Sequence, residues 1–166
     1  MDIASFTTRL ATPEDAALIS LHRRLMFADA GMGSSGALAS MEKHHERWVA
    51  ERIAEGKYIG WLTELTEEKG RVAASAGMLL LDWPPHPLDP EMAQRAYVLN
   101  VYVEPEYRRH RLGQALMEHA LAEAHRRGIH VVSLHATEKG RRLYETLGFQ
   151  TTNEMYFVEP AGLPES

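Results

Sequence analysis

The 166-residue chain contains no cysteine, and this absence excludes several kinds of chemistry at once. Disulfides, a thiolate nucleophile and cysteine-bound zinc are all ruled out. No run of about 18 apolar residues occurs, and the start MDIASFTTRL lacks the basic-then-apolar pattern of a signal peptide. We therefore expect a cytoplasmic location and no interaction with membranes.

Basic residues are also fewer than acidic ones: the chain has 18 Lys and Arg and 23 Asp and Glu, which gives a formal charge of -5. A surface that binds polyanions in general, such as nucleic acids, is therefore not expected. Hydrophobic residues make up 45% of the chain and charged residues 25%, as in ordinary globular proteins. At this length we expect one domain that spans residues 1–166.

Hydrophobic periodicity and end signals predict strands and helices along the whole chain. The expected strands cover residues 5–10, 57–65, 71–83, 95–103, 129–135 and 150–158. Four helices are expected. The first begins after a cap at Thr12, the second covers residues 37–55, the third runs from Leu112 to a stop at Gly128, and the fourth runs from Glu138 to a stop at Gly148. Four prolines in WPPHPLDPE, residues 83–91, predict a rigid loop.

The segment RRHRLGQALMEHAL, residues 108–121, places basic side chains at the start of an amphipathic helix. The helix macrodipole favours negative charge at that end, so the cluster predicts a bound anion. A strand, a short connection and a helix form an arrangement in which backbone NH groups converge on a phosphate. Neither GxxxxGK[ST] nor GxGxxG occurs, so a P-loop and a Rossmann fingerprint are not supported.

The segment NVYVEPEYRRHRLGQALM, followed by GRRLYETLGF, resembles the acetyl-CoA-binding half of the GNAT superfamily of N-acetyltransferases. The resemblance covers about residues 95–157, and the N-terminal half is similar in layout with weaker signals. It implies an α/β fold with a mixed, mostly antiparallel sheet of about six to seven strands, flanked by about four helices. The sheet is expected to splay open at the acetyl-CoA site.

The resemblance also implies a set of residues that bind acetyl-CoA. The family's pyrophosphate loop reads Q/R-x-x-G-x-G/A, and here Arg111 stands where the first glycine is usual. An arginine there can donate its backbone NH if its φ is negative, and its guanidinium can reach a phosphate through two hydrogen bonds. The implied set is the main chain of Val101 and Val103 along the pantetheine arm, then Arg108, Arg109, His110, Arg111, Leu112, Gly113 and Gln114 around the pyrophosphate, and Thr137.

Direct acyl transfer from a thioester needs a neutral amine, a donor for the oxyanion and a proton for the leaving thiolate. By resemblance, Tyr144 of LYETLGF protonates or hydrogen-bonds the departing sulfur, and the alternative is an ordinary core tyrosine. The strand before the loop carries no carboxylate, and Asn100 on it can only orient a water or the substrate. Candidates for the general base are Glu104, His135 and Glu154, with a water chain to solvent as the default.

The sequence thus predicts an enzyme that moves an acetyl group from acetyl-CoA to a primary amine of a small molecule. Residues 83–92, including His86, and the first two helices would form the acceptor side. A protein or peptide N-acetyltransferase, a CoA-binding regulatory module without turnover and a nucleic-acid-binding protein are the alternatives, and a homodimer is left open. No metal site is expected, because the adjacent His44 and His45 point about 100° apart on a helix and no HExxH occurs.

Overall fold

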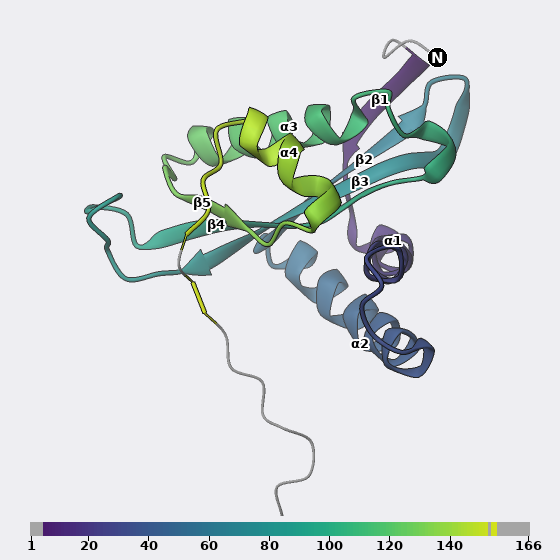
Figure 1. Ribbon diagram of the computed structural model, residues 1–166, viewed down its shortest axis with the longest axis horizontal. Coiled ribbons are helices and arrows are strands. Elements are labelled where there is room, and N and C mark those ends of the chain that lie inside the picture. The colour runs from purple at the N-terminus through teal and green to yellow at the C-terminus, as the bar shows by residue number, and fades with distance from the viewer. Residues whose placement is uncertain (1–4, 153, 156–166) are drawn as a thin grey trace, which may run out of the picture.

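The computed structural model describes residues 5–152, 154 and 155 (Figure 1). Its strands are β1 (Phe6–Leu10), β2 (Tyr58–Leu65), β3 (Glu68–Asp82), β4 (Gln94–Val103) and β5 (Val132–Leu134). Its helices are α1 (Ala16–Asp29), α2 (Ser35–Ala54), α3 (Leu112–Arg126) and α4 (Glu138–Thr146), and short 3₁₀ helices, Pro13–Asp15 and Pro105–Tyr107, precede α1 and α3. The predicted α/β class is confirmed.

The strands form one sheet in the order β1-β2-β3-β4-β5, antiparallel except for the parallel pair β4 and β5. The described residues therefore hold five strands, fewer than the resemblance implied. Of the strand predicted at residues 150–158, residues 150–152, 154 and 155 are not in a strand, and the others lie outside the described residues. Thr151 accepts a hydrogen bond from Arg141 of α4 (2.9 Å), which ties this segment to a helix instead of the sheet.

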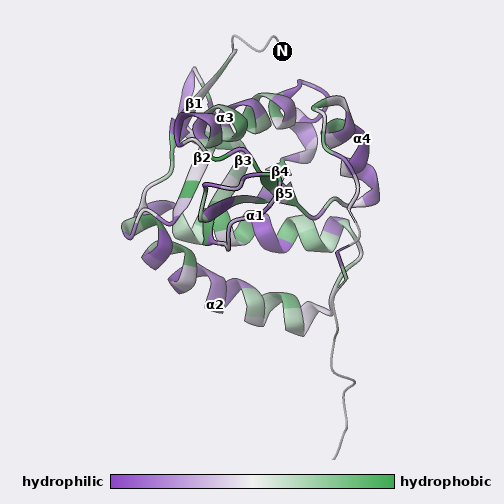
Figure 2. Ribbon diagram, turned by 90° about the vertical axis from the view of Figure 1, so that its left-hand side faces the viewer, coloured by the Kyte–Doolittle hydropathy of each residue, from purple (hydrophilic) through white to green (hydrophobic). Residues whose placement is uncertain are grey.

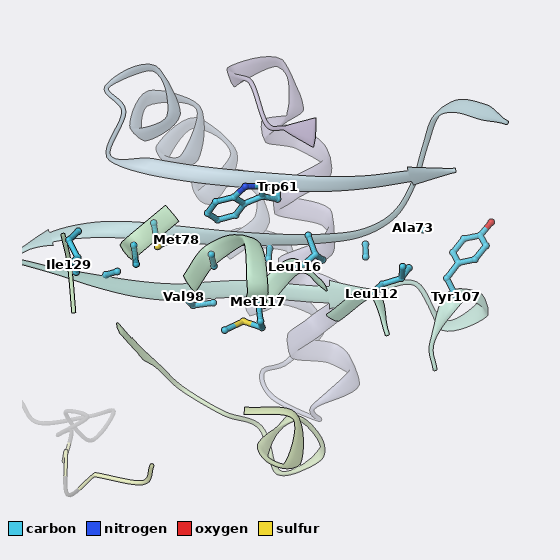
Figure 3. Packing of buried hydrophobic residues seen from close by; sticks show 14 residues of the cluster. Trp61, Ala73, Met78, Val98, Tyr107, Leu112, Leu116, Met117 and Ile129 are labelled. Carbon is cyan, nitrogen blue, oxygen red and sulfur yellow. The ribbon is translucent and has the colours of Figure 1, made fainter. Parts of the chain in front are cut away.

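The helices lie in two layers on the two faces of the sheet. Figures 1 and 2 show α3 and α4 over one face, and α1 beneath the other face with α2 beyond it. The larger core cluster lies between the sheet and α3, where Trp61, Met78, Val98, Leu116 and Met117 meet (Figure 3). A smaller cluster packs α1 and α2 against β2 on the opposite face.

Helix α3 buries the stripe of residues that its sequence predicts. Leu112, Leu116, Ala120 and Ala124 recur every four positions, and each is at most 2% exposed. Because residues four apart lie one above the other on a helix, this stripe holds α3 flat against the sheet. The helix start is thereby fixed beside the end of β4.

Strand β4 contains a β-bulge that changes which face its side chains occupy. The pairing with β3 is in register up to Leu99 and resumes at Tyr102, so Asn100 and Val101 together face one residue of β3. Asn100 has a φ of 57°, a left-handed conformation that asparagine tolerates better than most residues. Beyond the bulge, Val101 and Val103 pack with the core under α3. Asn100 is directed toward α1, whose Arg23 donates to its side chain.

Candidate functional site

The outer edge of β4 is the first feature of the site. Strand β5 pairs with β4 only as far as Leu134, opposite Val98, whereas β4 continues to Val103. The NH of Glu104 donates to β3 (2.9 Å), so by alternation the main-chain groups of Val103 and Val101 face the other side. There they have no strand partner among the described residues. An extended ligand could pair with this edge as an added strand would.

The loop between β4 and α3 is the second feature. Arg109 and Arg111 have φ values of 67° and 61°, while φ of the residues on either side of each is not positive. Such alternation turns successive NH groups toward one concavity, which is a common way to bind an anion. The NH groups of residues 111–114 donate to no acceptor among the described residues, and they point along the positive end of the dipole of α3. The predicted anion site therefore has the main-chain geometry that an anion requires.

Arg111 does not have the negative φ that was the condition for its NH to donate, because its φ is 61°. Its NH is nevertheless unused within the described residues. The position that caps α3 is left-handed, a conformation that glycine adopts without strain and that fits the glycine usual there in the family that the sequence resembles. A non-glycine residue in this conformation costs roughly 1–3 kcal/mol. The Arg111 guanidinium lies 3.3 Å from the Gln114 side-chain oxygen, and neither Arg109 nor Arg111 forms an ion pair within the described part of the chain. Two cations are thus available beside the NH groups.

Arg108 has a different environment from the two arginines that follow. Its Nε donates to the carbonyl of Val103 (3.0 Å), and its guanidinium forms an ion pair with Asp29 at the end of α1. These contacts join the loop to β4 and to the helix on the far face of the sheet. Arg108 therefore supports the shape of the loop. The Val103 carbonyl, which faces the unpaired side of β4, already accepts a hydrogen bond from it.

Gly113 lies where α3, α4 and β4 come together. A side-chain carbon built on it would lie 3.4 Å from Leu143 of α4 and 3.9 Å from Val103 of β4. A small residue is therefore tolerated there, whereas a long side chain would fill the space between the two helices and the strand edge.

Tyr144 of α4 is partly buried and packs against the core cluster that contains Val101. Its ring meets Phe149 edge to face, with centroids 6.0 Å apart. Its hydroxyl forms no hydrogen bond with another described residue, and burial raises the pKa of the phenol. The Tyr144 phenol is therefore protonated at neutral pH, and it donates its proton to no other described residue. Thr137 caps α4 by accepting from the NH of Gly140 (3.2 Å), which leaves its own proton free.

The three candidate bases lie in different surroundings. Glu104 approaches the buried His22, with 3.3 Å between its Oε1 and the ring Nε2. His135 contacts the hydroxyl of Tyr97, and it follows β5 directly, at the point where the pairing of β4 with β5 ends. Glu154 is exposed. His135 follows the last residue of β5 and Glu104 follows the last residue of β4, so both lie next to the unpaired edge of β4 along the chain.

A buried polar cluster on the α1 face was missed by the sequence analysis. The Asn100 side-chain oxygen accepts from Arg23 (2.7 Å), and its amide nitrogen donates to the Tyr58 hydroxyl (3.0 Å) and lies 3.5 Å from His45. The other ring nitrogen of His45 lies 2.8 Å from the Ser20 hydroxyl. Asn100 is only 1% exposed, so its amide groups are used within the fold and are not left to orient a substrate. The one amide in the otherwise apolar run VLNV was the available signal.

The histidines form no recognisable metal site. Within residues 5–152, 154 and 155, no three or more His, Asp or Glu side chains gather in a way that could hold a metal ion. His44 contacts the carbonyl of Ser40 (2.8 Å), and His86 accepts from the NH of Leu88 (3.2 Å) within its own loop. None of the described helices has the length and apolar character needed to cross a membrane.

Comparisons with known proteins identify the family of the chain. The sequence profile of the acetyltransferase (GNAT) family matches residues 20–149, and the chain belongs to this family. It is 29% identical over 110 residues to the ribosomal protein bS18-alanine N-acetyltransferase of Escherichia coli (strain K12), across 64% of this chain. The match spans 66% of that enzyme, just under two thirds of its length.

Two solved structures are similar over nearly their whole length. The GCN5-related N-acetyltransferase from Ralstonia eutropha JMP134 is 40% identical, with a TM-score of 0.86 over 95% of this chain and 99% of that one. A predicted acetyltransferase from Clostridium acetobutylicum, crystallised with acetyl-CoA, is 25% identical, with a TM-score of 0.83 over 93% and 96%. The chain thus belongs to a family of N-acetyltransferases, and this family uses acetyl-CoA as the acetyl donor.

Proposed function

We propose that this enzyme transfers the acetyl group of acetyl-CoA directly to a primary amine, with both substrates bound at once. The observations that carry the proposal are the unpaired edge of β4 and the free NH groups at the start of α3, with Tyr144 of α4 packed against the same core cluster as Val101 of β4. Each of the three has an unused hydrogen-bonding group within the described residues. Together they match what a bound thioester with a pyrophosphate needs.

The residues present fit acetyl-CoA in two respects. The NH groups around residues 109–114, with the guanidinium groups of Arg109 and Arg111, would neutralise and hold the pyrophosphate. The main chain of Val101 and the NH of Val103 would pair with the pantetheine arm, because the carbonyl of Val103 is already engaged by Arg108. Thr137 remains a weaker candidate, since its hydroxyl oxygen caps α4.

Tyr144 would act on the leaving group. Bound acetyl-CoA supplies an activated thioester carbonyl for attack by the amine. The phenol of Tyr144 holds its proton at neutral pH, because burial raises its pKa above the ordinary value, and can donate it to the departing sulfur. The proton lost by the amine would pass to solvent through water, with His135 and Glu104, at the two ends of the unpaired edge of β4, as the side chains that could assist.

The acceptor is the open part of this function. We keep a small-molecule amine as the leading acceptor, bound on the side of α1, α2 and the loop at residues 83–92. A protein amine is the second candidate, because the relative from Escherichia coli is named for an alanine of a ribosomal protein. A CoA-binding module without turnover would bind acetyl-CoA but release no CoA. A single domain and a cytoplasmic location also remain predictions.

A pair of matched variants tests the donor site. Gly113→Glu would place bulk and negative charge between α3, α4 and β4, so it should abolish acetyl-CoA binding by calorimetry and the rise in melting temperature that acetyl-CoA produces. Gly36→Glu makes the same change on α2, where no atom lies within 4 Å of the new carbon, and should leave both unchanged. Wild-type affinity in Gly113→Glu would show that the loop does not bind the pyrophosphate. Release of free CoA with an amine panel then tests turnover.

A further inference from the structure

The polar cluster on the α1 face contains a cation whose charge is not balanced. Arg23 is partly buried in α1, and its guanidinium lies 4.8 Å from the centre of the Phe27 ring. One terminal nitrogen donates to Asn100 (2.7 Å), while its Nε is buried with no partner in the described part of the chain. Several of its donors are therefore not used by any described residue.

No carboxylate compensates this charge among the described residues. The next residue, Arg24, pairs with Glu42 at 2.6 Å, whereas Arg23 forms no ion pair. The titratable groups that surround Arg23 are neutral near pH 7, because burial lowers the pKa of His45 to about 4 and raises the pKa of Tyr58 to about 12. A partly buried charge without a partner is unfavourable, so the folded protein gains little from this arrangement by itself.

The position of Arg23 relates it to the proposed reaction. Asn100, to which it is bonded, lies in the bulge of β4, next to the residue whose main chain would pair with the pantetheine arm. Helices α3 and α4 lie on one face of the sheet, and α1 and α2, where we place the acceptor, lie on the other (Figure 2). Arg23 belongs to α1 and therefore lies on the proposed acceptor side. The unpaired guanidinium is therefore separated from the opening of the sheet by one side chain.

We propose that the acceptor is a small amine with a carboxylate beside its amino group, an α-amino acid or a close analogue, and that Arg23 binds this carboxylate. The inference rests on the proposed acetyl transfer. A guanidinium matches a carboxylate through two parallel hydrogen bonds, and one unpaired cation balances one negative charge. A phosphate monoester carries about two charges and would call for a second cation, but the neighbouring Arg24 is neutralised by Glu42.

Matched acceptors test the carboxylate. Release of free CoA is measured with the twenty common α-amino acids and, for each acid that reacts, with its α-amide and its decarboxylated amine. The wild-type enzyme should prefer the acid by about a hundredfold in kcat/KM, the scale of losing hydrogen bonds to a charged group. Equal rates with acid and amide would overturn the inference. So would turnover of peptide N-termini with no reaction of free amino acids.

Variants on α1 test Arg23 itself. Arg23→Gln should lower kcat/KM for the amino acid about a hundredfold and leave kcat/KM for its amide unchanged. Arg23→Lys should recover part of the preference for the acid over the amide. Arg24→Gln should behave like wild type with both acceptors. An equal loss for acid and amide in Arg23→Gln would mark a structural role and refute the assignment. If Arg23→Gln does not fold, the comparison of acid with amide in the wild type still decides. Acetyl-CoA binding by calorimetry, measured separately, tells whether the donor site has failed instead.

Discussion

Replacing Tyr144 by phenylalanine separates catalysis from packing more directly than any other change in this chain. The substitution removes one oxygen and keeps the ring that meets Phe149 edge to face at 6.0 Å. Because the hydroxyl has no hydrogen-bond partner among the described residues, its removal breaks no bond within the described fold. We therefore expect the free energy of unfolding to change by less than about 1 kcal/mol, the scale of one ordinary hydrogen bond.

Turnover should respond differently. If the phenol protonates the departing sulfur, its loss should reduce kcat by roughly ten- to a thousandfold, at or just below the usual range for general acid catalysis. Because burial raises the pKa of Tyr144 above its ordinary value, the donor stays protonated throughout a neutral assay. The wild-type rate should therefore show no loss of this acid between about pH 7 and 9. Acetyl-CoA affinity should stay close to wild type.

Two measurements and one control decide the question. Chemical denaturation gives the free energy of unfolding, and steady-state CoA release gives kcat per folded molecule. Tyr107→Phe is the matched control, because Tyr107 (Figure 3) is a 5% exposed tyrosine of the same core. Its ring packs edge to face on Phe6. Tyr107→Phe should keep kcat. If Tyr144→Phe loses stability and keeps kcat, Tyr144 is a core residue and its role as general acid is refuted.

Other changes test the loop, the buried histidines and the bulge. Arg111→Gly should have a melting temperature no lower than wild type, since glycine accepts the left-handed φ of 61°. If Arg111→Ala and Arg111→Gly both lose roughly 1–3 kcal/mol of acetyl-CoA binding free energy, the Arg111 side chain contacts a phosphate. Stability should fall by roughly 2 kcal/mol for each of His22 and His45 between pH 7.5 and 5, because burial holds both pKa values at about 4 and the unfolded chain, near 6.5, takes up protons first. Denaturation curves that do not change with pH would contradict this. Gly77→Ala should lower the melting temperature and the free energy of unfolding by roughly 1–3 kcal/mol, because its new carbon would lie 1.9 Å from the Tyr58 hydroxyl.

The elements with local signals were predictable from the sequence. The helix predicted at residues 37–55 is α2, Ser35–Ala54, and the Ser34 side chain caps it by accepting from Ala37. The buried stripe of α3 and its end before Gly128 were predicted in the same way, because hydrophobic periodicity and helix capping depend on residues that are close together in the sequence. The strand predicted at residues 129–135 is only Val132–Leu134, since the apolar Ile129, which is buried in the core, satisfies the same pattern outside the strand.

The shape of the anion loop could not be predicted in full. The basic residues at the start of α3 predict an anion-binding loop, which stays a prediction, but they did not predict the left-handed φ of Arg111, because an arginine usually avoids that region. What holds the loop is the ion pair of Arg108 with Asp29, which lie 79 residues apart in the chain. A contact at that separation leaves no local pattern, so only the folded chain reveals it.

The polar cluster around Asn100 explains why a hydrophilic residue lies in a buried strand. A buried amide needs partners for both of its polar atoms, and Asn100 finds them on α1 and β2, 77 and 42 residues away. Packing alone does not call for Arg23 as the donor, because a neutral side chain could satisfy the same oxygen without placing an unbalanced charge there. Arg23 brings a cation, and no carboxylate within the described residues neutralises it. An anionic acceptor would supply the missing charge only when it is bound, so the feature that weakens the fold is the one that would select the substrate.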